Sequence, residues 1–264
     1  MKLIQTNIKD EDKQQAISVR NHIISGQRVI GQPGAGLRKT LANLEERQQN
    51  KTVEVTDWLL DDAELIQNIM LTKAGIEGEE KLCEYLALLI KHDYDLNDII
   101  AFASLAYEPD DSKDYIPDTD VLLVYGRNVL ILDAKNIKTN SNNPLRIEKH
   151  EILDSKDKLV LEVNPSTYVW QRIFKNAGTE VDSIEGYVCI VNNTETFIIR
   201  DDEWEKSQHK LIHISELKNV LKEWIKDKDN TLHLDMLTEI AKAQIKEETS
   251  AEIDFNSIKR EFGV

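Results

Sequence analysis

Acidic and basic side chains flank two apolar runs in the middle of the chain. Asp118 and Asp120 stand just before the first run, and Asp133 and Lys135 stand just after the second. Carboxylate oxygens are the ligands that Mg²⁺ prefers, and an ammonium group can offset negative charge that develops on a reacting phosphate. The pattern therefore indicates metal-dependent chemistry. A structural alternative stays open, in which these are solvated residues at the end of a sheet and Asp118 forms an ion pair with Lys135.

Two β-strands joined by a tight turn are expected to position these side chains. Residues 121–125 and 129–132 are rich in apolar and β-branched side chains, and Gly126-Arg127 suits a two-residue type II′ turn. In that register the numbers of paired residues add up to 253, which sets Asp120 opposite Asp133. Paired side chains share one face and lie roughly 4.5–5.5 Å apart, so two carboxylates there repel each other. A divalent cation between them is the simplest explanation.

A helix expected over residues 79–92 supplies a third carboxylate. Its apolar residues recur at helical spacing, and Glu79 stands three and four positions before Leu82 and Cys83, which places it on the buried face. A carboxylate in the first turn of a helix can complement the helix dipole, or it can offer an oxygen to a metal ion. The residues alone leave both roles open.

Several short segments, taken in order, form a recognisable signature. They are Gly75-Ile76-Glu77-Gly78-Glu79 at a helix start, then Asp120, then Asp133-Ala134-Lys135-Asn136, then Asn164-Pro165 followed by Gln171. Together they resemble the D…(D/E)-x-K signature of the restriction-endonuclease-like, or PD-(D/E)XK, nucleases, and in particular the nuclease-related domain (NERD) family. The resemblance covers roughly residues 75–192. It departs from the family where Asp133 replaces the usual Glu, and where the Gly that usually follows the (D/E)-x-K-N segment is absent.

This resemblance implies an α/β fold, a restriction-endonuclease-like core with a mixed β-sheet flanked by helices. It also implies a metal-dependent nuclease that hydrolyses phosphodiester bonds in nucleic acid, with DNA favoured, in a defence or mobile-element setting. Lys135 would orient the attacking water, with a pKa that partial burial can lower. Gln171 would hydrogen-bond water or phosphate, or else be an ordinary surface residue. The implied ligands of Mg²⁺ or Mn²⁺ are Glu79, Asp120, Asp133 and the carbonyl of Ala134.

The charge distribution argues against a broad, non-specific nucleic-acid surface. The net charge is −15, and residues 73–215 alone carry 16 basic and 27 acidic side chains. Such an acidic core repels a phosphate backbone. A second hypothesis therefore stays open, a catalytically silent protein-interaction module that binds a partner protein through its terminal helices. Against it, the sequence retains every charged residue that the chemistry needs.

Residues 31–40, GQPGAGLRKT, have only part of the pattern of a phosphate-binding loop. Leu37 and Arg38 separate Gly36 from Lys39-Thr40, which breaks the G-x-x-x-x-G-K-[ST] spacing. No convincing strand precedes the loop. We expect a hinge between two helices here, and nucleotide binding is a minor alternative.

The chain is expected to have three parts. These are a helical N-terminal extension over residues 1–72, whose last helix ends near residue 73, a PD-(D/E)XK/NERD-like core over 73–215, and a C-terminal helical segment over 216–264.

The composition indicates where the protein acts. No run approaches about 18 apolar residues and the start resembles no signal peptide, so we expect a cytoplasmic protein without membrane contact. Cys83 and Cys189 lie in apolar runs and are expected to be buried thiols in a reducing compartment. No Cys/His spacing suggests zinc.

Overall fold

A six-stranded mixed sheet organises the computed structural model of this chain. The strand order is β10-β9-β5-β4-β3-β2, in which β4 runs antiparallel to both of its neighbours and the other adjacent strands are parallel. The strands are β2 (Val29–Ile30), β3 (Ile100–Leu105), β4 (Thr119–Tyr125), β5 (Asn128–Lys135), β9 (Ser183–Ile190) and β10 (His209–His213). The structure describes residues 2–4, 8–50, 58–106, 118–137, 144–148, 151–162, 166–192 and 209–243.

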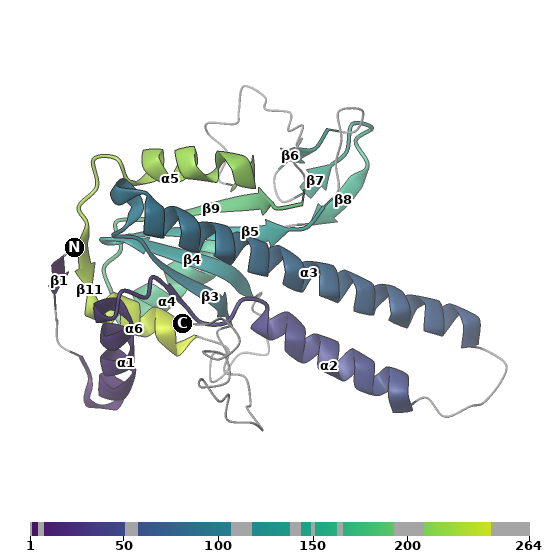
Figure 1. Cartoon of the computed structure of the whole chain (residues 1–264), viewed down its shortest axis with the longest axis horizontal. Coiled ribbons are helices and arrows are strands. Elements are labelled where there is room, and N and C mark those ends of the chain that lie inside the picture. Colours follow the sequence, from purple (N-terminus) through teal and green to yellow (C-terminus); the bar gives the residue numbers. More distant parts are fainter. Residues whose placement is uncertain are drawn as a thin grey trace, which may run out of the picture.

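Helices cover both faces of this sheet and make three layers (Figure 1). The central strands are apolar on both sides because each side packs against helices. The expected α/β class, a mixed sheet flanked by helices, is therefore confirmed. One layer holds α3 (Trp58–His92) and α5 (Leu217–Ile225), and the other holds α1 (Lys13–Ile24), α4 (Thr167–Ala177) and α6 (Leu234–Lys242).

The β4–β5 hairpin has the register that the sequence predicts. Its pairs run from Tyr125 with Asn128 to Val121 with Leu132. In the turn, Gly126 has a φ of +61°. A type II′ turn requires this left-handed conformation at its first central residue. The local signals of two apolar runs and one glycine were therefore sufficient to fix the hairpin.

One continuous helix, α3, replaces the two helices expected on either side of residue 75. The expected break is wrong because the glycines there serve close packing. A Cβ added at Gly75 would lie 2.7 Å from Cδ1 of Leu37, and one added at Gly78 would lie 3.2 Å from Cβ of Asn136. The two glycines thus let α2 (Ala35–Asn50) and the end of β5 approach α3 closely. In Figure 1, α2 and the first half of α3 form a helical hairpin that projects beyond the sheet.

Residues from the expected N-terminal extension contribute to the main sheet. β2 pairs with β3, and beside that pairing the backbone N–H of Ala101 donates to the carbonyl of Arg28 at 2.7 Å. On the opposite layer α1 packs against α6, where Nε2 of Gln15 donates to the carbonyl of Ala241 at 2.9 Å. The expected boundary between residues 72 and 73 falls inside α3.

Two smaller sheets and short 3₁₀ helices complete the described part of the chain. A parallel pair joins β1 (Lys2–Ile4) to β11 (Thr231–His233). A three-stranded antiparallel sheet, with order β6-β7-β8, packs against β9 and β10. Its strands are β6 (Arg146–Glu148), β7 (Glu151–Leu153) and β8 (Leu159–Glu162). The 3₁₀ helices are η1 (Asp10–Asp12), η2 (Tyr94–Leu96) and η4 (Ile214–Glu216).

The cysteines lie where the sequence predicts. Cys83 and Cys189 are both buried, and neither forms a disulfide. Burial raises the pKa of the Cys83 thiol to about 12, which keeps it protonated at neutral pH.

In the described ranges, no helix combines the length and the apolar character needed to cross a membrane.

Candidate functional site

A cavity of about 400 Å³ opens where β4 begins and β5 ends, against α2 and α3. It gathers predicted site residues that are far apart in the sequence. Asp118 also lines the cavity, from an exposed position before β4. The predicted residues in its wall are Glu79, Asp120, Ala134 and Lys135.

The two aspartates of the hairpin contact each other at this end of the sheet. Oδ2 of Asp120 accepts a hydrogen bond from the backbone N–H of Ala134 at 2.7 Å, and a side-chain hydrogen bond joins Asp120 to Asp133. Burial raises the pKa of Asp120 well above its usual range, and the negative charges of Asp133 and Glu79 raise it further. Two such carboxylates cannot both be ionised without a compensating positive charge.

Lys135 supplies part of that compensation. Its ammonium group forms an ion pair with Asp133, and its side chain is only 25% exposed. The alternative pairing with Asp118 is therefore not the one observed. Burial alone would lower the pKa of Lys135, but the charges of Asp133 and Asp120 outweigh burial and raise that pKa. The expectation that partial burial lowers this pKa is wrong here, because the neighbouring carboxylates keep the lysine protonated.

Glu79 reaches the cavity from the middle of α3, where it is only 5% exposed. Its Oε2 accepts hydrogen bonds from the backbone N–H of Gly34 at 2.8 Å and from the hydroxyl of Ser104 at 3.2 Å. Burial raises the pKa of Glu79, and these two hydrogen bonds oppose that rise. Gly34 directly precedes α2, so Glu79 places its carboxylate at the amino end of a helix, as a dipole role requires. That helix is α2 and not α3, in contrast to the expectation from the sequence.

A kink in β3 explains how Ser104 comes to face Glu79. The φ of Ser104 is +50°, a left-handed conformation inside a strand, and the ladder lacks a Ser104–Asp120 pair although the positions on either side are paired. Ala103 packs in the α3–α5 layer, whereas Leu105 packs in the opposite layer. The side-chain alternation therefore inverts at Ser104, which directs its hydroxyl toward α3.

Two predicted site residues are absent from the described lining of this cavity. Asp133 contacts Asp120 and Lys135, which do line it. Gln171 is the other absent residue. It lies on the exposed face of α4, because Trp170, Ile173 and Phe174 occupy the buried face of that short helix. Nε1 of Trp170 donates to the hydroxyl of Thr119 at 2.9 Å and so fastens α4 beside the start of β4. In this structure, α4 supports the site from behind without supplying Gln171 to it.

A divalent cation fits the chemistry of these donors. Across the residues that the structure describes, no three His, Cys, Asp or Glu side chains are already grouped to hold a metal ion. Asp120 and Asp133, however, offer hard oxygen donors whose mutual repulsion a cation would relieve. Both hydrogen bonds that Glu79 accepts from the described residues reach Oε2, and within that part of the chain Oε1 stays available for a cation. Ala134 lines the same cavity.

Three further residues shape the site. Asn136 belongs to the (D/E)-x-K-N segment, and its Nδ2 donates to the carbonyl of Ala74 at 2.7 Å, tying the end of β5 to α3. Gly34 lies in the glycine-rich loop that we expected to be a hinge, and the short strand β2 precedes that loop. Ser104 gave no sequence signal, because its partners, Glu79 and Ala35, lie 25 and 69 residues away.

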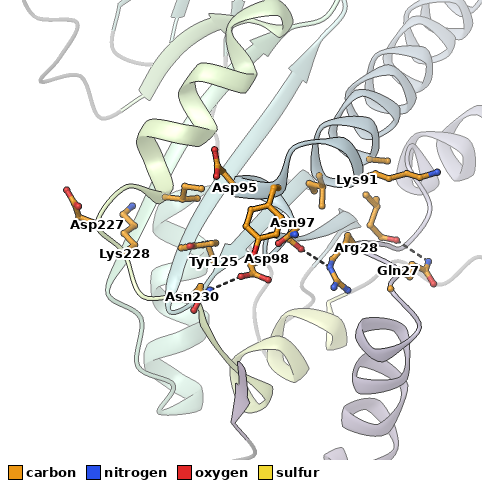
Figure 2. A pocket seen from close by; sticks show the side chains of 16 residues that line it. Gln27, Arg28, Lys91, Asp95, Asn97, Asp98, Tyr125, Asp227, Lys228 and Asn230 are labelled. Atoms are coloured by element: carbon orange, nitrogen blue, oxygen red, sulfur yellow. Dashed lines mark hydrogen bonds between the residues drawn. The ribbon is translucent and has the colours of Figure 1, made fainter. Parts of the chain in front are cut away.

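A second, wider cavity of about 1190 Å³ opens at the other end of β4, beside Tyr125 (Figure 2). None of the predicted site residues lines it. Its polar groups largely bond to each other: Asn230 donates to Asp98 at 2.7 Å, and Nε of Arg28 donates to the carbonyl of Asn97 at 3.0 Å. The described residues of this cavity include none of the predicted site residues, so the smaller cavity is the better candidate.

Comparisons with protein-family models, curated proteins and solved structures found no match for this chain.

Proposed function

We propose that this protein is a metal-dependent nuclease with a restriction-endonuclease-like core, acting on nucleic acid and preferentially on DNA. The observation that carries the proposal is the contact between Asp120 and Asp133 beside a protonated Lys135. The order of elements adds support, because α3, the strands β3 to β5, α4 and β9 follow the expected order of helix, strands, helix and strand. Metal-dependent phosphodiester hydrolysis uses oxygen ligands for the cation and a positive charge near the phosphate.

Each side chain has a role in this proposal. Asp120 and Asp133 would hold Mg²⁺ or Mn²⁺, with Glu79 and the carbonyl of Ala134 as further oxygen donors. A bound divalent cation supplies Lewis-acid activation of a phosphate and of a water molecule. Lys135 orients the attacking water and offsets the charge that builds on the phosphate, which suits a lysine that stays protonated.

A second candidate function is a catalytically silent protein-interaction module. It is favoured by the acidic character of residues 73–215 and by the cavity wall. Among the described residues of that wall Lys135 is the one cation, and it is already paired with Asp133. A partner protein would then bind through the terminal helices.

Cleavage assays separate the two candidates. Labelled linear, circular and single-stranded DNA would be incubated with Mg²⁺, Mn²⁺ or EDTA, comparing the wild type with Lys135→Ala. We expect cutting that EDTA abolishes and that Lys135→Ala slows by about 10²–10³-fold, the usual effect of removing one group that stabilises the transition-state charge. Lys175→Ala, on the exposed side of α4, is the matched control and should cut like the wild type.

Two outcomes would contradict the nuclease proposal. If the wild type cuts none of the substrates, the interaction module becomes the better assignment, whether or not calorimetry detects Mn²⁺ binding. Cutting that survives in Lys135→Ala and in EDTA would place the activity elsewhere or in a contaminant.

A further inference from the structure

The contacts around Glu79 assign a role to two residues outside the expected site. Gly34 and Ser104 both donate to Oε2 of Glu79, at 2.8 and 3.2 Å. The hydroxyl of Ser104 also accepts from the backbone N–H of Ala35 at 3.2 Å. Glu79, β3 and the first turn of α2 are thereby joined in one buried network.

The backbone of Ser104 is strained. Because a strained conformation persists only where the surrounding contacts hold it, the network around Glu79 is more than incidental packing. A non-glycine residue in the left-handed region is strained, and such residues concentrate at functional sites. In a regular strand the side chain of Ser104 would share a face with Phe102, on the layer opposite α3. The strained φ of +50° is what brings its hydroxyl to Glu79.

The network fixes one oxygen of the carboxylate and leaves the other for a ligand. Asp120 is held in the same way, with Oδ2 bound to the backbone N–H of Ala134. Carboxylates that bind metal ions are commonly oriented by such hydrogen bonds, and losing the supporting partner weakens metal affinity by about 10–100-fold. The arrangement at Glu79 therefore has the form of a ligand prepared in advance.

We propose that Ser104 and Gly34 are positioning residues that hold Oε2 of Glu79 and present its Oε1 to a divalent cation at the Asp120–Asp133 pair. The inference rests on the proposed function and deepens it. The loop that precedes α2 becomes a built part of the metal site and not a hinge.

The test measures Mn²⁺ affinity by calorimetry and so does not depend on cleavage. Ser104→Gly removes the hydroxyl and accepts the left-handed φ without strain. We expect it to weaken Mn²⁺ binding by about 10–100-fold while its melting temperature stays equal to that of the wild type or rises. Ser183→Gly is the matched control, a strand serine whose hydroxyl donates to Asn128 at the far end of β5, and it should bind Mn²⁺ normally.

A second measurement uses the wild type alone. Hydrogen exchange of the Gly34 amide should be slow without metal and slower still with Mn²⁺, because the cation immobilises the carboxylate that Gly34 holds. Faster exchange of this amide on adding Mn²⁺ would show that Glu79 leaves Gly34 to bind metal, and the inference would be overturned.

The failures of the inference and of the proposed function are distinguishable. Equal Mn²⁺ affinity in the wild type and Ser104→Gly overturns the inference and leaves the nuclease proposal intact. Mn²⁺ binding that depends on Ser104, in a protein that cuts no DNA, supports the inference and contradicts the nuclease. A wild type that binds no Mn²⁺ refutes both.

Discussion

Burial and neighbouring carboxylates raise the pKa of Asp120, so the folded protein favours the protonated side chain. For a group whose pKa is higher in the folded state, the stabilising contribution is complete below the usual aspartate pKa of about 4 and is lost as pH rises through the folded-state value. At neutral pH without metal, the Asp120–Asp133 contact therefore reduces the stability of the fold.

Replacing Asp120 with Asn should remove this loss of stability. Without metal at pH 7, we expect Asp120→Asn to raise the melting temperature by about 2–4 °C, the equivalent of roughly 1 kcal/mol for a chain of this size. An amide oxygen can still accept from the backbone N–H of Ala134, so the packing is retained. Scanning calorimetry between about pH 4 and pH 8 should show the gain shrink toward the acid end of the range.

The control for this prediction is Asp182→Asn, at an exposed position, which should leave the melting temperature unchanged across the same range. Mn²⁺ should raise the melting temperature of the wild type but not that of Asp120→Asn, because only the wild type binds it tightly. A variant less stable than the wild type at pH 7 would mean that the ionised Asp120 stabilises the fold.

At the scale of elements, the β4–β5 turn depends on one glycine. Gly126 has a φ of +61°, and a Cβ there would lie 2.0 Å from the backbone carbonyl oxygen of Asp229. Gly178, at the end of α4, has a similar φ of +70° with nothing within 4 Å of an added Cβ. Alanine substitutions at these two glycines therefore separate the cost of a left-handed φ from the cost of a steric clash.

Replacing each glycine with alanine should lower the free energy of unfolding by a different amount. Gly178→Ala should lose about 1–2 kcal/mol of unfolding free energy, from the left-handed φ alone. Gly126→Ala should lose about 1–3 kcal/mol more, because the new methyl group meets backbone that cannot rotate away. Urea denaturation measures both values, and equal losses would show that the segment around Asp229 moves aside freely.

Elements set by local signals could be predicted from the sequence, and elements set by distant contacts could not. The hairpin register follows from two apolar runs and a turn, so Asp120 and Asp133 were found together. The continuity of α3 was missed because Gly75 resembles a helix break, while its real role is contact with Leu37 of another helix. Ser104 was missed because its conformation depends on a partner in α3.

At the scale of the whole molecule, the first and the last elements that the structure describes pack together beside the sheet. α1 contacts α6, β1 pairs with β11, and an ion pair of 2.8 Å joins Lys242 to Asp12. Side chains from α1 and α6 pack on the face of the sheet that carries Phe102 and Leu122, and Trp170 of α4 packs on the same face. The expected three-part division therefore has a physical consequence, because a core cut at residues 73 and 215 would expose this face.

A fragment of residues 73–215 should consequently not fold by itself. It begins inside α3 and lacks β2, α1, α5 and α6, so apolar surface on both faces of the sheet would meet water. We expect it to bind a hydrophobic dye and to melt without a cooperative transition. A fragment of residues 1–243 keeps every described element and should unfold in one transition, as the full chain should. Cooperative melting of the 73–215 fragment would instead establish an independent core and make both terminal segments accessory to it.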